Sequence, residues 1–397
     1  MRKGILTLGI VALGLMGPLA AIAQNNYGKD LNFLKKHKDV IELKSDDGKS
    51  RVAIVADYQG RVMTSSAEGE SGNSYGWLNY KLIESGEIQK HINALGGEDR
   101  FWLGPEGGQY AIFFKPGTRF VFEDWFTPAS LDTEAFDVAF SKKDEAEFTR
   151  TIALQNYSGT DLKVDIRRNI KVYSKKEVEK NLRVKIGDKV SFVGYRSENT
   201  MKNVSGFDWK KDKGLLSIWI LGMYNPSDRT NVVVPLKGKN PIVNSDYFGA
   251  VSPDRLTTKG KIAYFKGDGK SRGKIGVAPA NTKPILGSYS ADKGILTIVK
   301  FSFHNEKDYV NSQWKHQEHP YGGDVINSYN DGPVSEDGSQ LGPFYELETS
   351  SSARELKNNE SITHTHMTFH FEGDKTQLNK ISKKLLGASL EEIENAL

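Results

Sequence analysis

The sequence predicts an all-β protein, a large antiparallel β-sandwich with a few short helices. From residue 40 onward, short segments rich in valine, isoleucine, phenylalanine, tyrosine and threonine are separated by glycine, asparagine, aspartate and proline. The 39 glycines suit a chain with many turns. These segments do not alternate with helices, so a doubly wound parallel sheet is not expected. No fixed-period repeat occurs in the sequence, which disfavours a propeller.

The expected strands span most of the chain, and we expect residues 24–397 to form one domain. They cover residues 51–56, 109–114, 148–155, 162–173, 189–196, 215–223, 231–235, 261–265, 295–303, 344–349 and 362–371. Short helices are expected over 30–40, 78–85 and 178–182. From about residue 376 to 397, leucine and isoleucine recur at helical spacing, which predicts one or two amphipathic helices that dock on the body.

The first 23 residues have the pattern of a cleavable signal peptide. Arg2 and Lys3 precede an uncharged apolar run over residues 4–20, and Ala21-Ile22-Ala23 provides the small residues that signal peptidase requires. An uncleaved anchor is the alternative, but the run is short and ends in small residues. No later segment has the ~20 apolar residues that a membrane helix needs. We therefore expect a periplasmic or secreted protein without a membrane span after cleavage.

Composition excludes several classes of function. The chain has no cysteine, which rules out disulfides, thiolate metal sites, cysteine nucleophiles and a lipidated cysteine. The formal charge of +4 includes Arg2 and Lys3, so residues 24–397 carry 4 − 2 = +2. The basic residues form no dense block, so nucleic acid is not an expected partner.

Residues 96–109 combine glycines, acids, an arginine and a tryptophan in one stretch. Glycine lets backbone approach a ligand closely, arginine and carboxylates bind hydroxyls directionally, and tryptophan offers a flat face to a sugar ring. The candidate substrate-binding residues here are Arg100, Trp102, Glu106 and Gln109. A braced structural turn is the alternative, and the stretch lacks the phosphate-loop and dinucleotide motifs.

Residues 314–333 form a second polar and aromatic stretch, with little strand character. Loops with such unlike side chains are favoured places for ligand contact. Asp324 and Asn327 are candidate substrate-binding residues. His316 and His319 are candidate acid–base groups, although both could simply be solvated.

The last two expected strands carry titratable groups on defined faces. Alternation places Glu346 and Glu348 on one face, and Glu348 is a candidate general base if burial and its neighbour raise its pKa. His364, His366 and His370 share one face of the following strand. If a hairpin brought the glutamates to them, these histidines could bind zinc or a similar divalent ion. A polar outer face of the sheet is the alternative, and no other cofactor is expected.

Five motifs of the chain are GGEDRFWLGPEGGQYAIFF, KIGVAPANTKPILGSYSADKGILTIVKFSF, PYGGDVINSYNDGP, FYELETSSSA and ITHTHMTFHF. Together they resemble an uncharacterised family of secreted bacterial proteins that is related to the galactose mutarotase-like (aldose 1-epimerase-like) supersandwich. The resemblance implies a concave sheet that binds sugar, with Glu348 as the analogue of the catalytic base and Arg100 as the analogue of the sugar-holding arginine. The Asn-His dipeptide of true mutarotases is absent from this chain. His316 or His319 replaces that acid only if its loop folds over the site.

Four functions follow from these observations. The first is an enzyme, epimerase-like or otherwise active on glycans, that uses Glu348 with one of the two loop histidines. The second is a non-catalytic carbohydrate-binding or accessory protein. The third is a metal-dependent hydrolase that uses the three strand histidines, and the fourth is an exported structural protein without activity. The first two share a carbohydrate ligand and a site on the concave sheet.

Overall fold

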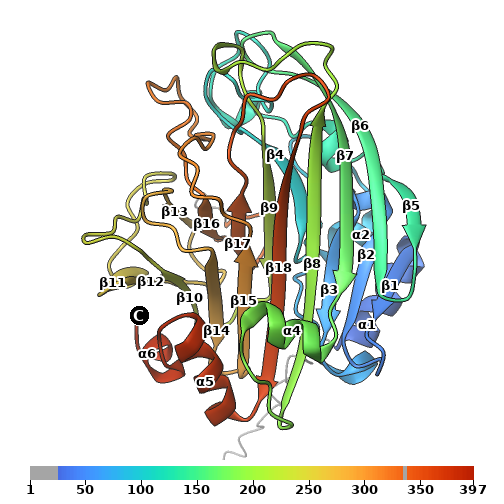
Figure 1. The fold of residues 1–397 in the computed structure, drawn as a ribbon, viewed down its shortest axis with the longest axis vertical. Coiled ribbons are helices and arrows are strands. Elements are labelled where there is room, and N and C mark those ends of the chain that lie inside the picture. The colour runs from blue at the N-terminus through green and yellow to red at the C-terminus, as the bar shows by residue number, and fades with distance from the viewer. Residues whose placement is uncertain (1–25, 334–337) are drawn as a thin grey trace, which may run out of the picture.

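A computed structural model describes residues 26–333 and 338–397, so the expected signal peptide lies outside the described part. The strands form three antiparallel sheets, and the two larger ones make up most of the body (Figure 1). The ten-stranded sheet has the order β11-β12-β10-β14-β15-β18-β8-β7-β6-β5. Its strands are β5 (Asp137–Ser141), β6 (Glu145–Gln155), β7 (Asp161–Val172), β8 (Val190–Asn203), β10 (Thr230–Pro235), β11 (Leu256–Lys259), β12 (Ile262–Lys266), β14 (Ile285–Ser290), β15 (Ile295–Phe301) and β18 (Ser361–Gly373).

The five-stranded sheet, in the order β13-β16-β17-β9-β4, carries the candidate site. Its strands are β4 (Arg100–Gly104), β9 (Ser217–Tyr224), β13 (Gly273–Val277), β16 (Ile326–Asn330) and β17 (Tyr345–Ser350). The third sheet contains β1 (Val40–Lys44), β2 (Arg51–Val55) and β3 (Arg61–Ser66). These antiparallel sheets confirm the predicted all-β sandwich.

The main core lies between the five-stranded and ten-stranded sheets. One buried cluster joins Phe101 and Ile220 of the smaller sheet to Ile166 of the larger one. A second joins Leu347 to Val299 and Val232. Every second side chain of β17 and β9 therefore points into this core. The side chains between them point to the opposite face of the five-stranded sheet.

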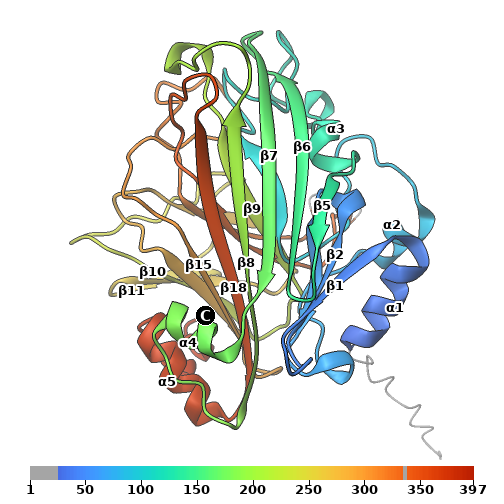
Figure 2. The ribbon, with the colours of Figure 1, turned by 45° about the vertical axis from the view of Figure 1, so that its right-hand side comes forward.

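The helices cover the outside of the sheets (Figure 2). Helix α1 (Tyr27–His37) and α2 (Tyr80–Ser85) pack on the three-stranded sheet. The tail forms α5 (Lys375–Leu385) and α6 (Leu390–Glu394), whose apolar residues pack with α4 (Lys175–Leu182) on the outer face of the ten-stranded sheet. The remaining helical elements are α3 (Ala129–Asp132) and the single turns Ala56–Tyr58, Gly69–Ser71, Phe122–Asp124 and Lys211–Lys213. Within the described residues, no helix combines the length and apolar character needed to cross a membrane.

Three expectations about strands are wrong. Residues 109–114 form a turn-rich segment and no strand. The apolar character of this segment serves packing from a loop, where Phe113 contacts Trp102 and Trp125. The stretch 314–333, expected to have little strand character, contains β16. Finally, β17 and β18 form no hairpin: β17 pairs with β9 and β16, whereas β18 pairs with β15 and β8 in the other sheet.

Candidate functional site

The face of the five-stranded sheet that points away from the core carries a row of polar side chains. Strand pairing aligns Asn327 of β16, Glu348 of β17 and Arg100 of β4 across the sheet, with Leu221 of β9 between the last two. Residues paired across an antiparallel sheet point to the same side, as do residues two positions apart along a strand. Lys274, Trp219, Glu346 and Trp102 consequently share this side, which we call the Glu348 face.

Glu348 lies at the centre of the face and is fully buried. Its Oε2 accepts a hydrogen bond from Lys274 Nζ at 3.0 Å and another from Trp219 Nε1 at 2.9 Å. The Lys274 ammonium also lies 4.7 Å from the centre of the Trp219 ring. Burial alone would lower the pKa of Lys274, but the carboxylates of Glu348, Glu106 and Glu346 outweigh it and raise that pKa. Lys274 is therefore a cation that organises the acids around it.

Three other carboxyl groups near Lys274 hold their protons more strongly than usual. Burial, reinforced by the neighbouring Glu348, raises the pKa of Glu346 well above its ordinary value. Burial also raises the pKa of Glu106 and that of Asp324, against the opposing effect of Lys274. The face thus combines a lysine ammonium with carboxyl groups of raised pKa, a combination suited to hydrogen bonding or proton transfer.

Asp324 and Asn327 meet through the loop that carries Tyr247. The Tyr247 hydroxyl donates to Asp324 Oδ2 at 2.5 Å and accepts from Asn327 Nδ2 at 2.9 Å. Asn244 Nδ2 also donates to Asp324 Oδ2, at 3.0 Å. The space for these side chains exists because β13 has a glycine at this point: a Cβ on Gly276 would collide with Asp324 Oδ2 and with the Tyr247 hydroxyl.

Glu106 and Gln109 connect the loop after β4 to the stretch that begins near Asn311. Trp314 Nε1 donates to Glu106 Oε1 at 3.1 Å. Gln109 Nε2 donates to the carbonyl oxygen of Gln317 at 2.9 Å, and Gln109 Oε1 accepts from the backbone N–H of Gln317 at 3.0 Å. Glu106 therefore stays beside the Lys274–Glu348 pair, whereas Gln109 uses its amide to hold two loops together and is not positioned as a ligand group.

Arg100 and Trp102 form one end of the face. The Arg100 guanidinium lies 4.1 Å from the centre of the Trp102 ring and donates to Asp132 Oδ1 at 2.9 Å. Trp102 in turn meets Trp219 edge-on, with ring centres 5.5 Å apart. Arginine and two indoles therefore continue the polar row from Glu348 to the edge of the sheet.

Several buried polar atoms on this face have no hydrogen-bond partner within the described residues. They are Glu348 Oε1, Arg100 Nε, Trp102 Nε1 and Ser217 Oγ. Buried polar atoms are nearly always paired in native proteins, so each such atom asks for an explanation. Comparable atoms also lie between the sheets, among them Glu98 Oε1 and His366 Nε2, so the four on this face are informative only together with the charged and aromatic groups around them.

His316 and His319 do not reach this face, and the proposed acid role of either histidine is corrected. Both side chains are exposed. His316 packs edge-on against Phe120 and Tyr157, with ring centres 5.5 and 5.8 Å away. His319 Nε2 lies 3.9 Å from Glu318 Oε1, and both side chains are largely exposed. Their loop does fold toward the site, but it presents Trp314 to Glu106 instead of a histidine.

The three strand histidines point into the core between the sheets, not outward, and hydroxyl or carboxylate groups of other residues bond them. Thr349 Oγ1 lies 2.8 Å from His364 Nε2 and 2.9 Å from His366 Nδ1. His370 lies between Thr297 Oγ1, at 2.9 Å, and Glu98 Oε2, at 2.7 Å. In the described part of the chain, no three histidine, aspartate or glutamate side chains are grouped to hold a metal ion. The metal site predicted from His364, His366 and His370 is therefore wrong.

Sequence reasoning missed three central residues: Lys274, Trp219 and Tyr247. Lys274 stands at the start of a glycine-containing strand, where a lysine is ordinarily read as solvated. Trp219 lies in a continuous apolar segment, where alternation gives no sign of a functional side. Its distance from Glu348 is set by pairing between residues 129 positions apart in the sequence. Only the raised density of aromatics around residues 245–248 could have suggested Tyr247.

An all-β sandwich with one loop-covered polar face is the class of protein that these observations define. Residues 25–397 match the model of a family described as a family of unknown function (DUF6786), and the chain belongs to that family. No curated protein matches the sequence significantly.

Solved structures with a similar arrangement include proteins described as related to galactose mutarotase. A galactose mutarotase-like protein from Lactobacillus casei ATCC 334 is 10% identical with a TM-score of 0.45, over 84% of this chain and 99% of that one. A galactose mutarotase related enzyme from Lactobacillus acidophilus is also 10% identical, with a TM-score of 0.43 over 85% and 97%. A protein from Synechocystis sp. PCC 6803 has a TM-score of 0.47 at 10% identity, over 85% and 96%. The family match confirms the prediction that the chain belongs to an uncharacterised family.

Proposed function

We propose that the protein is an exported carbohydrate-binding or carbohydrate-modifying protein whose ligand binds at the Glu348 face. The observation that carries this proposal is that unpartnered buried atoms of Glu348, Arg100 and Trp102 lie on one side of one sheet together with the Lys274 ammonium and two indole rings. A sugar hydroxyl both donates and accepts, so a few hydroxyls on one ring match a carboxylate oxygen and two N–H groups at once.

The aromatic groups around these atoms suit the same ligand. Trp102 and Trp219 lie beside the carboxylate, and the half-buried Trp314 and Tyr247 extend the indole and phenol surface toward solvent. Flat aromatic faces with a few placed polar groups are typical of small-molecule sites. A ligand that enters past Trp314 and Tyr247 reaches Glu348 from the solvent side.

If the protein modifies its ligand, Glu348 and Glu346 are the acid–base pair that the geometry supports. Glu346, with its raised pKa, holds a proton that it can donate to a ring oxygen, while Glu348 takes a proton from the anomeric hydroxyl. The ring C–O bond then breaks as the carbonyl forms, and reversal from the other side of the carbonyl exchanges the anomers. Glu346 replaces the loop histidines as candidate acid.

Binding without turnover is the second candidate, and the Lys274–Glu348 contact favours it. The Lys274 ammonium and the Trp219 indole both donate to Glu348 Oε2, so one of the two carboxylate oxygens is already occupied. Such a pair still binds hydroxyls well.

Calorimetry with a panel of neutral monosaccharides and oligosaccharides tests the proposal, with anomer exchange followed by NMR for any sugar that binds. We expect Glu348→Gln to lose binding of that sugar. Glu98→Gln is the matched control, because Glu98 is equally buried but lies between the sheets on His370. The assignment is contradicted if the wild-type protein binds no sugar of the panel, or if Glu348→Gln binds the sugar with the same affinity as the wild type. Binding without anomer exchange selects the non-catalytic function.

A further inference from the structure

A second cavity lies where the three-stranded sheet and its helices meet the sandwich, away from the Glu348 face. Its volume is about 610 Å³. Its lining includes Asp30 of α1, Trp77, Tyr80 of α2, Lys293 between β14 and β15, and His370 of β18. That volume is within the range of small-molecule sites, roughly 300–1,000 Å³.

Aromatic rings dominate the lining. Tyr75, Trp77, Tyr80, Tyr224 and Tyr345 all border the cavity. The Tyr75 ring stacks on His370 with centres 4.2 Å apart and an angle of 15° between planes. Such walls favour a flat ring as ligand, because offset or edge-on aromatic contacts add to the burial of apolar area.

The polar side chains of the lining already have partners inside the protein. The Asp30 carboxylate accepts from the hydroxyls of Ser74 and Tyr80. His370 uses one ring nitrogen on Thr297 and the other on Glu98. A ligand rich in hydroxyls would lose its bonds to water here without replacement, which is costly in a buried site. This separates the cavity from the Glu348 face, where buried polar atoms lack partners.

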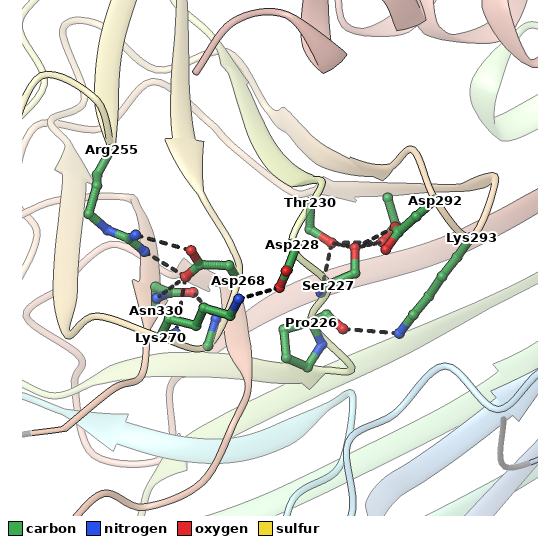
Figure 3. A network of polar contacts seen from close by, with 12 residues as sticks. Pro226, Ser227, Asp228, Thr230, Arg255, Asp268, Lys270, Asp292, Lys293 and Asn330 are labelled. Atoms are coloured by element: carbon green, nitrogen blue, oxygen red, sulfur yellow. Dashed lines mark hydrogen bonds and ion pairs between the residues drawn. The ribbon is translucent and has the colours of Figure 1, made fainter. Parts of the chain in front are cut away.

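Lys293 is the exception. Its Nζ donates to the carbonyl oxygen of Pro226 at 3.0 Å, and Figure 3 shows it reaching that carbonyl beside the contacts of Ser227, Thr230 and Asp292. Among the described residues, no carboxylate oxygen lies within 4.0 Å of Lys293 Nζ, and burial lowers the pKa of Lys293 against the opposing charge of the more distant Asp292. An ammonium has three donors, so two remain for a ligand. A half-buried cation of this kind favours an anionic group beside the aromatic walls.

We propose that this cavity binds a small aromatic carboxylate, with the ring between the tyrosine and tryptophan side chains and the carboxylate on Lys293. The ligand class follows from three features together: aromatic walls, internally satisfied hydroxyl and carboxyl groups, and one cation free of a carboxylate partner in the described structure. This site is independent of the carbohydrate proposal, and its residues are separate from the Glu348 face.

Calorimetry on the full-length purified protein tests the inference with 4-hydroxybenzoate as probe. The neutral analogue 4-hydroxybenzyl alcohol tests the need for the carboxylate, and glucuronate tests whether a sugar ring can replace the aromatic one. We expect 4-hydroxybenzoate to bind more tightly than the other two. Tighter binding of glucuronate, or no binding of the aromatic acid at millimolar concentration, overturns the ligand class.

Lys293→Met should weaken 4-hydroxybenzoate binding about tenfold or more, because it removes a charge-assisted hydrogen bond. Lys300→Met is the matched control: Lys300 also donates to a backbone carbonyl, that of Asn181 at 2.7 Å, but lies outside the cavity. Equal affinities of wild type and Lys293→Met place the ligand elsewhere and contradict the site. Glu348→Gln should bind the aromatic acid as wild type does, so failure of this inference and failure of the carbohydrate proposal give different results.

Discussion

Strand β17 lies between two regions of buried polar side chains, one between the sheets and one on the Glu348 face. Between the sheets, Thr349 bonds His364 and His366, and Glu98 bonds His370, so polar groups from both sheets pair with one another. On the opposite face, Glu348 bonds Lys274 and Trp219 but leaves one carboxylate oxygen without a partner. Buried polar atoms without a partner occur in both regions, among them Glu98 Oε1 and His366 Nε2 between the sheets, so neither burial nor a missing partner alone identifies a functional site. The Glu348 face differs because it combines such atoms with the Lys274 ammonium and with carboxyl groups of raised pKa.

The inter-sheet region contains a fully buried ion pair between Arg168 and Asp99, and the Glu348 face has a buried one between Arg100 and Asp132. Arg168 Nη2 contacts Asp99 Oδ1 at 2.5 Å, and Arg168 also bonds the Asn199 side chain and the carbonyl oxygens of Gly60 and Asp99. Ser197 donates to the other Asp99 oxygen at 2.7 Å. This network joins four segments of the chain, so we assign it to stability, whereas we propose ligand binding for the Glu348 face.

The largest expected effect comes from breaking that network. Arg168→Met leaves Asp99 buried without its cation, and we expect a loss of about 3–5 kcal/mol in the free energy of unfolding, measured with denaturant. Arg167→Met is the neighbouring control, because Arg167 is mostly exposed and pairs with Glu147. It should cost about 1 kcal/mol or less. Similar losses in both variants would contradict the structural role assigned to the inter-sheet network.

The second prediction concerns pH, because the two regions respond in opposite directions. Burial lowers the pKa of His364 to about 3 and that of His366 to about 4, so both stay neutral in the folded protein. The unfolded chain takes up these protons once the pH falls below about 6.5, and stability is lost progressively from there toward pH 4. Each histidine contributes a slope of about 1.4 kcal/mol per pH unit within that window.

Glu346 has the opposite sign. Because its pKa is raised in the folded protein, the folded protein holds this proton more strongly than the unfolded chain does. The loss of stability caused by Glu346 is therefore small at low pH, and it grows as the pH rises above about 4.3, the ordinary pKa of glutamate in an unfolded chain. Unfolding free energies between pH 4.5 and 6.5 should therefore fall less steeply with acid in His364→Asn/His366→Asn than in wild type. Glu346→Gln should make the fall steeper. Parallel curves for the three proteins would show that these groups do not titrate as their burial requires.

The sequence allowed the strands and several site residues to be predicted, for reasons that are local. Alternation alone placed Glu346 and Glu348 on one face and Thr349 on the other. It could not decide which face meets the other sheet, so the histidines of β18 were assigned to a metal site. Lys274 was missed because its partner Glu348 is 74 residues away, and sequence spacing carries no signal for that contact.

A third, smaller effect tests whether the Glu348 face is shaped for a ligand. Gly276 leaves space for Asp324 and the Tyr247 hydroxyl, and any Cβ there would displace them. We expect Gly276→Ala to weaken binding of whichever sugar the wild type binds by about tenfold, since two hydrogen-bonding groups shift together. Gly48→Ala is a control for glycine replacement as such, because nothing lies near its Cβ position, although its positive φ costs some stability. An unchanged affinity in Gly276→Ala would remove Asp324 and Tyr247 from the proposed site.

The smallest expected effect on sugar affinity is that of Gln109→Ala, which tests whether Gln109 holds two loops together or binds the ligand. Gln109 bonds the backbone of Gln317 at both ends of its amide, so Gln109→Ala should cost about 1–2 kcal/mol of stability by leaving those backbone groups unpaired. Sugar affinity should change by less than about threefold, because Glu106 still bonds Trp314 and keeps the two loops close. Thermal unfolding and calorimetry on the same preparation measure both quantities. A large loss of affinity with unchanged stability would return Gln109 to the ligand-binding residues and would extend the Glu348 face to the outer end of this loop.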